Sequence, residues 1–339
     1  MTEIALLDDY QRVALTMADW SAVRARAAVT AFDRPLGTAD EAVRVLERFD
    51  IVCHMRERMP FPRALIERLP RLKFIGVTGP GHRTLDLAAA TERGIIVSHT
   101  SNRGQGGHAT PELTIGLMLA LTRHIALEDR RMRQGLWQGT VGGVLHGKTL
   151  GLVGLGRVGG RVAQLAQAFG MEVIAWSANL APERAAGLGV AAVAKDELFR
   201  RSDIVSVHLV LSERTRGIVG AREIGLLKPT AYLVNTSRGP IVDEAALVAA
   251  LGAHAIAGAA LDVYDNEPLP PGHPLTAFDT VVLTPHLGYV SREGYRTYYE
   301  DTVENILAYL DGAPIRVLNS QVLSQDYSGN RSTASPDRG

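Results

Sequence analysis

The 339-residue sequence contains very little cysteine and has no excess of charge of either sign. Its single cysteine, Cys53, lacks a partner for an intramolecular disulfide, and its apolar neighbours Ile51 and Val52 predict an inert, buried thiol. Lysine and arginine total 36, as do aspartate and glutamate, so no net field favours nucleic acid or an anionic membrane. We therefore expect a protein of the reducing cytoplasm that meets charged ligands only locally.

Long hydrophobic runs are also missing. The stretch 113–122 is far shorter than the roughly 20 apolar residues of a membrane-spanning helix, and the first residues lack the features of a secretory signal. Histidine and cysteine do not occur at zinc-binding spacing, so we expect no metal site. The polar residues 324–339 contain few large apolar side chains, which predicts a disordered tail.

Short apolar segments alternate with helical patterns, which predicts the α/β class with parallel sheets. One series contains EIALLDD, FDIVCHM, LKFIGVTG and GIIVSHT. The second runs from KTLGLVGLG to TVVLTPH and has the size of a dinucleotide-binding domain. The sequence thus predicts two domains, each with its own parallel sheet.

Two helices lie at the ends of the second series. The first has Thr110 as the expected N-cap and Pro111 as its first residue, with His108 as a hinge or cap residue before it. The last helix follows Ser291 as N-cap and stops at Gly312. We expect this last helix to pack back on the first domain, which makes that domain discontinuous.

The predicted boundaries follow from that crossing. We expect residues 1–101 and 292–323 to form one domain and residues 102–291 to form the other, which has the size of a dinucleotide-binding domain.

The strongest local motif is GLGRVG, in which Gly154, Gly156 and Gly159 follow an apolar strand and open an alanine-rich helix. The first glycine permits a tight turn, the second lets the backbone approach a pyrophosphate, and the third allows close packing of helix on strand. The NH groups of Arg157 and Val158 would then face the anion. This context favours dinucleotide binding over an ordinary strand-to-helix turn.

The next strand ends at Ser177, where a carboxylate usually binds the adenosine ribose. A serine can hydrogen-bond a ribose hydroxyl but does not repel a 2′-phosphate, and it can equally be a plain helix N-cap. Ala178 and Asn179 add no arginine, and Arg184 stands further along the chain. The sequence leaves the choice between NAD and NADP open.

Three titratable residues follow predicted strands of the second series: Arg238, Glu267 and His286. Each has an ordinary explanation, as a surface arginine, a turn cap or a loop histidine, and Asp262 can be a strand-end hydrogen-bonding residue. The carboxyl ends of parallel strands converge on one ligand crevice, so together these residues indicate a site.

The motifs GLGRVG, VSVHLVLSERTRGIVG, LVNTSRGPIVDEAAL, ALDVYDNEP and LTPHLG, in this order, resemble the D-isomer-specific 2-hydroxyacid dehydrogenases. The family includes phosphoglycerate dehydrogenase and glyoxylate and hydroxypyruvate reductases. The resemblance implies that His286 is the acid/base, Glu267 its carboxylate partner and Arg238 the clamp for the substrate carboxylate. It also implies that residues 1–101 and 292–323 form the substrate domain and that residues 102–291 form the NAD(P)-binding domain. It further implies a homodimer, built around the helix of Leu113 and around Trp137.

The same resemblance implies further cofactor and substrate residues. Asp262 would lie by the nicotinamide carboxamide, and the cofactor cleft would be lined by His208, Leu209, Thr215 and Thr236. The loop Gly79, Pro80 and Gly81 matches the one whose NH groups hold the substrate carboxylate.

The first-domain loops depart from the family pattern in one respect. Proline has no NH group, so Gly79 or Gly81, rather than Pro80, would have to supply the donor. Arg56 and Arg58, which follow a strand of the same domain, either reach the mouth of the active site or lie in a solvated loop, and the sequence favours the loop.

The predicted activity is hydride transfer between NAD(P)H and a small 2-oxo acid or D-2-hydroxy acid. An arginine fork suits a carboxylate, and an imidazolium beside a carboxylate suits proton donation to the substrate oxygen. The same residues also occur in corepressor-like proteins that sense dinucleotides with little turnover, so a binding module is the alternative.

Overall fold

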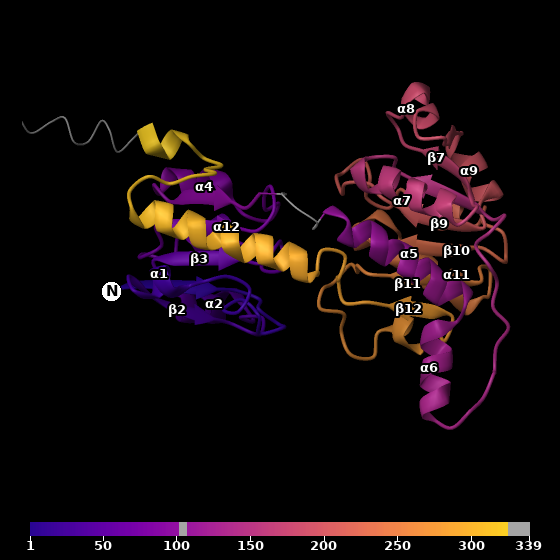
Figure 1. Ribbon diagram of the computed structural model, residues 1–339, viewed down its shortest axis with the longest axis horizontal. Helices are drawn as coiled ribbons and strands as arrows, with labels where there is room; N and C mark the ends of the chain where they lie inside the picture. Colours follow the sequence, from indigo (N-terminus) through magenta and orange to yellow (C-terminus); the bar gives the residue numbers. More distant parts are fainter. Residues whose placement is uncertain (102–106, 325–339) are drawn as a thin grey trace, which may run out of the picture. The chain divides into compact units, whose positions relative to one another are not determined.

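The computed structural model describes residues 1–101 and 107–324, which divide into two compact units (Figure 1). Unit 1 contains residues 1–106 and 291–339, and unit 2 contains residues 107–290. The sequence places its boundaries after residues 101 and 291. The predicted disordered tail lies outside the described residues, except for Ser324.

Unit 1 is built on a parallel sheet of five strands in the order β2-β1-β3-β4-β5. The strands are β1 (Thr2–Leu6), β2 (Ala27–Ala31), β3 (Ile51–His54), β4 (Phe74–Val77) and β5 (Ile96–His99). The helices are α1 (Ser21–Arg24), α2 (Ala39–Leu46), α3 (Arg63–Ile66), α4 (Leu87–Glu92) and α12 (Arg292–Leu310).

Unit 2 contains a parallel sheet of seven strands in the order β12-β11-β10-β9-β6-β7-β8. The strands are β6 (Thr149–Val153), β7 (Glu172–Trp176), β8 (Ala191–Ala192), β9 (Ile204–Val207), β10 (Tyr232–Asn235), β11 (Gly258–Leu261) and β12 (Val281–Leu283). The helices are α5 (Ala109–Thr122), α6 (Ile125–Arg133), α7 (Arg157–Ala168), α8 (Pro182–Ala186), α9 (Lys195–Arg201), α10 (Ala221–Ile224) and α11 (Glu244–Gly252), with 3₁₀ turns η2 (Gly239–Ile241) and η3 (Pro274–Ala277).

Four of the inner strands, β3, β4, β9 and β11, are buried along their whole length. Parallel strands covered by helices on both faces read as continuous apolar runs, which is why the sequence reveals them. The predicted α/β class with two parallel sheets is confirmed. The edge strands β2 and β8 were not predicted, because their alanine-rich, partly exposed sequences carry no such run.

Helix α12 belongs to unit 1 and lies across its sheet, in contact with β4 and β5 (Figure 1). The Ser291 side chain caps it by accepting a hydrogen bond from the NH of Gly294 at 3.0 Å, as the sequence predicts. Gly312 follows the helix with a φ of 74°, a left-handed conformation that glycine adopts without strain. The buried Asp301 carboxylate accepts two hydrogen bonds from Ser101, at 2.6 Å from its NH and 2.5 Å from its hydroxyl.

Helix α5 packs in unit 2 against α7 and the strands β10 to β12. Its predicted start was wrong: the helix begins at Ala109, and His108 occupies the N-cap position without a capping side-chain bond. The Thr110 hydroxyl instead donates to the carbonyl of Gly288 at 2.6 Å. The Thr110 side chain, which the local pattern assigned to capping, is thus hydrogen-bonded to a residue 178 positions away in the chain.

Each sheet reverses its strand order once. In unit 2 the reversal lies between β6 and β9, and in unit 1 it lies between β1 and β3. In open α/β sheets, ligands bind beside the carboxyl ends of the strands at such a switch point. The loops after β6 and β9 are therefore where a cofactor site is expected.

Candidate active site

The loop after β6 has the geometry that the glycine motif predicts. Gly154 has a φ of 108°, and a Cβ there would lie 2.6 Å from the carbonyl oxygen of His208. A Cβ on Gly159 would lie 2.2 Å from the carbonyl oxygen of Gly154, so the third glycine allows close helix-to-strand packing. At Gly156, by contrast, no described atom lies within 4 Å of the position that a Cβ would take. The middle glycine therefore faces open space at the start of α7, where a pyrophosphate can approach the backbone.

Ser177 directly follows β7 and is half-buried. Its carbonyl accepts a hydrogen bond from the NH of Leu180 at 3.1 Å, which closes a turn. Arg184, on α8, donates from Nε to the carbonyl of Leu155 at 3.1 Å, although it lies 29 residues further along the chain. The structure thus brings Arg184 to the glycine loop, from which it is remote in sequence.

The other predicted cofactor residues lie on strand ends near the same switch point. His208 follows β9, and burial lowers its pKa to about 4, so the ring is neutral; its Nε2 lies 2.9 Å from the Ser206 hydroxyl. Leu209 packs toward the glycine loop, where a Cβ on Gly154 would lie 3.0 Å from its Cδ2. The buried Thr236 hydroxyl lies 2.9 Å from that of Thr114 on α5.

Thr215, another predicted cofactor residue, forms hydrogen bonds within its own loop. Its hydroxyl donates to the carbonyl of Val210 at 2.7 Å and accepts from the NH of Ser212 at 2.8 Å. The side chain thus orders the 210–215 loop. Its contact with a cofactor stays a prediction.

Arg238 follows β10 at the start of the 3₁₀ turn η2 and is half-buried. The Asn235 side chain shapes this turn: its Nδ2 donates to the Arg238 carbonyl at 2.9 Å, and its Oδ1 accepts from the NH of Ser237 at 3.0 Å. The guanidinium donates through Nη1 to the Ser237 carbonyl at 2.7 Å. Its charge also reaches the Glu267 carboxylate, whose pKa it helps to lower.

Glu267 and His286 form an ion pair, with 2.6 Å between Oε2 and Nδ1 and with side chains 35% and 25% exposed. Burial alone would raise the pKa of Glu267, but the hydrogen bond and charge of His286 outweigh it and lower that pKa. An ionised carboxylate only accepts, so the proton on the imidazole side lies on Nδ1. The other nitrogen, Nε2, is thereby left for a substrate oxygen.

The backbone around His286 is held by Asp262. His286 has a φ of 55°, an unusual conformation for a residue other than glycine. The fully buried Asp262 carboxylate accepts from the NH groups of Leu287 at 2.7 Å and Gly288 at 2.8 Å and from the Thr284 hydroxyl at 2.6 Å. Burial raises the pKa of Asp262 although these donors favour its charged form. The carboxylate therefore fixes the loop that carries the histidine; its predicted contact with a nicotinamide stays a prediction.

Several residues of this network were missed by the sequence reasoning. Asn235 ends β10 next to the predicted Thr236, and Thr284 directly follows β12, two residues before His286, and these positions are the one signal that points to them. Tyr264 donates its hydroxyl to the carbonyls of Leu261 and Thr284 and its NH to Glu267 Oε1 at 3.0 Å. These contacts join the ends of β11 and β12 and orient Glu267.

The predicted substrate loop Gly79, Pro80 and Gly81 lies in unit 1, after β4. The NH of Gly79 already donates to the buried Thr100 hydroxyl at 2.7 Å. Gly81 has no described atom within 4 Å of a Cβ position, and its NH has no hydrogen-bond partner among the described residues. Of the two candidate donors, Gly81 is therefore the available one.

The prediction that Arg58 lies in a solvated loop was wrong. Its Nη1 donates to the carbonyl of Asp8 at 2.7 Å, and its guanidinium stacks on the ring of Tyr10 at 4.5 Å. Arg56 is half-buried, with its NH donating to the Thr78 hydroxyl at 2.7 Å and its guanidinium beside Gly79. Both arginines are part of the carboxyl edge of the unit 1 sheet.

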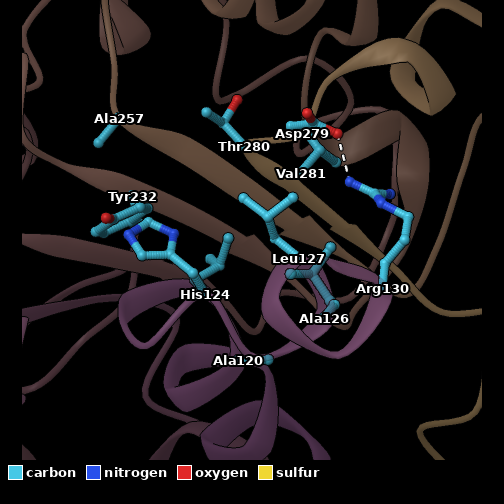
Figure 2. A pocket seen from close by; sticks show the side chains of 12 residues that line it. Ala120, His124, Ala126, Leu127, Arg130, Tyr232, Ala257, Asp279, Thr280 and Val281 are labelled. Carbon is cyan, nitrogen blue, oxygen red and sulfur yellow. Dashed lines mark hydrogen bonds and ion pairs between the residues drawn. The ribbon is translucent and has the colours of Figure 1, made fainter. Parts of the chain in front are cut away.

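A separate pocket of about 40 Å³ lies between α6 and the β12 edge of unit 2 (Figure 2). Ala126 and Leu127 line it from the helix and Thr280 and Val281 from the strand side, and an ion pair between Arg130 and Asp279 borders it. Ligand sites are usually about 300 Å³ or larger. This pocket is too small for a 2-oxo acid and is not the candidate site.

Within residues 1–101 and 107–324, no group of three or more histidine, cysteine, aspartate or glutamate side chains is arranged to hold a metal ion. None of the helices in the described ranges is both long and apolar enough to cross a membrane.

Known proteins are similar to this chain in sequence and in fold. Residues 115–288 match the family described as D-isomer specific 2-hydroxyacid dehydrogenase, NAD binding domain. The chain is 41% identical over 275 residues to a glyoxylate reductase of Aeropyrum pernix, covering 78% of this chain and 82% of that one. It is 37% identical over 279 residues to a D-3-phosphoglycerate dehydrogenase of Archaeoglobus fulgidus, covering 82% of this chain and 52% of that one. The crystal structure of phosphoglycerate oxidoreductase from Vibrio cholerae superimposes with a TM-score of 0.87 at 34% identity, covering 92% of this chain and all (100%) of that one.

Proposed function

Because the chain belongs to the D-isomer specific 2-hydroxyacid dehydrogenase family, we propose that Arg238, Glu267 and His286 carry out its reaction. The protein is an oxidoreductase that transfers a hydride between NAD(P)H and a 2-oxo acid or D-2-hydroxy acid. The observation that carries the residue assignment is the 2.6 Å pair of His286 and Glu267, which lies within electrostatic reach of Arg238.

His286 is the acid/base. The Glu267 carboxylate accepts a hydrogen bond from Nδ1–H, so the ring acts through Nε2. This nitrogen donates a proton to the substrate oxygen in reduction and accepts a proton from it in oxidation. The negative charge of Glu267 favours the imidazolium that reduction requires. Asp262 acts as a positioning residue because it holds the left-handed backbone of His286 through Leu287 and Gly288.

Arg238 binds the substrate carboxylate. A guanidinium presents two parallel NH donors to a carboxylate, which orients the substrate as well as attracting it. Asn235 fixes the turn that carries the arginine. We assign Gly81, rather than Gly79 or Pro80, as the backbone donor of the unit 1 loop, since the NH of Gly79 is already bonded.

The glycine loop fits a dinucleotide. The open side of Gly156 and the NH groups of Arg157 and Val158 at the start of α7 would hold the pyrophosphate, and Ser177 would meet the adenosine ribose. His208, Leu209 and Thr236 would line the rest of the cleft. When bound, the nicotinamide supplies or accepts the hydride.

The relatives are named for small substrates, glyoxylate and 3-phosphoglycerate among them. We propose that this chain likewise acts on a small 2-oxo acid. Oxidation of NADH and of NADPH should be followed separately with glyoxylate, hydroxypyruvate, pyruvate and phenylpyruvate. Turnover with at least one acid supports an enzyme; tight dinucleotide binding with negligible turnover on all would favour a sensing module instead.

The Arg238 assignment has its own test. Arg238→Lys retains the charge but not the planar fork, so the variant should lose most of its activity. The matched control is Arg216→Lys, at an exposed arginine in the loop between β9 and α10. If Arg238→Lys turns over at near the wild-type rate, the carboxylate clamp lies elsewhere.

We also propose a homodimer that uses α6 and the segment after it. In α6 no residue is buried, and Ile125 and Met132 are more than half exposed. Trp137 is 73% exposed in the segment that follows. Exposed apolar groups gathered in this way mark interaction sites. Light scattering should give a dimer mass that Trp137→Glu lowers to that of a monomer, whereas Val210→Glu, at another exposed apolar residue, should leave it unchanged.

The proposed compartment is the reducing cytoplasm. Cys53 is the only cysteine and is buried, and burial raises its pKa to about 12, so the thiol is inert. The fold then needs no oxidant, and its melting temperature should be the same with and without reductant. A large difference would contradict this assignment.

A further inference from the structure

The end of β7 lacks the carboxylate that discriminates against a 2′-phosphate. In dinucleotide folds that use NAD, an acidic side chain there accepts hydrogen bonds from the ribose hydroxyls and repels a phosphate. Here the position holds Ser177, and the residues of the following turn, Ala178 and Asn179, are uncharged. Nothing in this turn repels a phosphate.

Arg184 supplies a positive charge beside the same turn. Its Nε is bonded to the carbonyl of Leu155, between Gly154 and Gly156, so the guanidinium is tied to the glycine loop. Among the residues that the structure describes, its two terminal nitrogens have no hydrogen-bond or ion-pair partner. Their donors are therefore available to an incoming anion.

Arg157, the other arginine close to the glycine loop, points elsewhere. Its Nη1 lies 3.5 Å from the position that a Cβ on Gly107 would take. The side chain thus extends toward the start of α5. Of these two arginines, Arg184 is the one whose helix, α8, directly follows the turn after β7.

We propose that Arg184 binds the 2′-phosphate of NADP and makes this protein prefer NADPH to NADH. The proposal rests on the assignment of the glycine loop to dinucleotide binding. A guanidinium held at one nitrogen loses less conformational freedom when it binds a phosphate, and its fork matches phosphate geometry. Ser177 contributes by leaving the phosphate unopposed.

The test measures binding without turnover. Dissociation constants of NADPH and NADH, from quenching of protein fluorescence, are determined for the wild type and for Arg184→Ala. The wild type should bind NADPH more tightly. Loss of a charge-assisted hydrogen bond should weaken NADPH binding by about tenfold or more and change NADH binding by less than about threefold.

Two further variants test whether the Arg184 side chain itself is the cause of the weaker NADPH binding. Arg200→Ala removes an arginine of α9 that pairs with Asp196, and it should change neither constant. Arg184→Lys keeps the positive charge, so it should retain more NADPH affinity than Arg184→Ala does. Equal weakening of both dinucleotides by Arg184→Ala would overturn the proposal, since it would mean that the arginine only supports Leu155.

A wild-type protein that binds NADH more tightly than NADPH would also overturn the proposal for Arg184. The two assignments can fail separately. If neither dinucleotide binds, the glycine loop itself is wrongly assigned; if both bind equally, the loop is right and the role of Arg184 is wrong. Absence of 2-oxo acid turnover would bear on neither result, because no substrate is present in these measurements.

Discussion

The two sheets share a parallel topology but differ at the point where their strand order reverses. In unit 2, the glycines after β6 leave open space next to the backbone of Gly156. In unit 1, side chains occupy the corresponding place after β1 and β3: the Tyr10 hydroxyl donates to Asp8 Oδ1 at 3.2 Å, and Arg58 donates to the Asp8 carbonyl. The strand order reverses in both units, and the side chains that follow the reversal decide how much space is left beside the backbone there.

The charge states differ as well. In unit 2, the pair of Glu267 and His286 lowers the pKa of the carboxyl and so keeps it ionised. In unit 1, burial raises the pKa of Asp8 to about 6 and lowers the pKa values of His54 and His82, whose rings lie 4.9 Å apart. Burial also keeps His208 of unit 2 neutral, so the two edges differ mainly at the pair of Glu267 and His286, which holds an ionised carboxylate.

The largest expected effect tests whether the chemistry lies at the unit 2 edge. His286→Asn removes the acid/base, and asparagine tolerates the left-handed backbone there. The chemical step should slow by about 10²- to 10⁴-fold, the usual contribution of one acid/base group, with dinucleotide binding retained. Single-turnover kinetics measures the step.

The matched control for that variant is His254→Asn, at an exposed histidine of unit 2 with a similar φ of 53°. It should leave the rate unchanged. An equal loss of rate in both variants, or lost thermal stability without selective loss of turnover in His286→Asn, would place the chemistry elsewhere.

A smaller effect is expected from filling the open crevice of unit 2. Gly156→Val adds a side chain where no described atom lies within 4 Å, so the fold should persist while dinucleotide binding weakens by about tenfold or more. Calorimetric titration with NADH and NADPH measures the affinity. Gly252→Val, also in open space but at the end of α11, is the control. Unchanged affinity in Gly156→Val would contradict the comparison of the two crevices.

The ion pair itself predicts a change in pH dependence. Reduction needs the imidazolium and should decline as pH rises, whereas oxidation needs the neutral ring and should increase over the same interval. Glu267→Gln removes the carboxylate whose charge favours the imidazolium, so both limbs should move to lower pH in this variant. The control is Glu244→Gln, in a second pair 3.1 Å from His273. If the pH profiles of reduction and oxidation are the same in Glu267→Gln and the wild type, Glu267 is not the partner of the catalytic histidine.

The smallest effect concerns stability and unit 1. The pKa of Asp8 in the folded state is about 6, above its value in the unfolded state. Its contribution to the free energy of unfolding is therefore fully present at pH below about 4 and is lost as pH rises through 6. Asp8→Asn cannot ionise, so it should be more stable than the wild type at pH 8, and the difference should shrink toward pH 5. Thermal melts at both values measure it.

The control for Asp8 is Asp40→Asn, an exposed carboxylate paired with Arg68. The wild type and Asp8→Asn differ at one titratable group only. The contributions of His54 and His82 to the pH dependence of stability, which have the opposite sign, are therefore the same in both proteins and cancel in the difference. A difference that is constant across pH would mean that Asp8 is not held in its protonated form by burial.

Local patterns predicted the parts that depend on neighbouring residues. The apolar runs of the inner strands, the spacing of Gly154, Gly156 and Gly159, and the cap at Ser291 all act within a few residues of the chain. The resemblance to a family is what pairs His286 with Glu267 in the sequence, because no local pattern joins them. The weak edge strand β2 and the neighbours of Asp262 had no comparable signal.

The sequence by itself determined the α/β class, the glycine loop and the type of chemistry, because hydrophobic periodicity and backbone freedom are local properties of residues. Only the tertiary structure decided that Thr110 holds Gly288, that Thr100 occupies the NH of Gly79, and that Arg184 reaches Leu155. Each of these contacts joins residues 21 to 178 positions apart in the chain. Such partners are set by how helices pack on a sheet, and buried polar groups take whichever partner that packing brings within hydrogen-bonding distance.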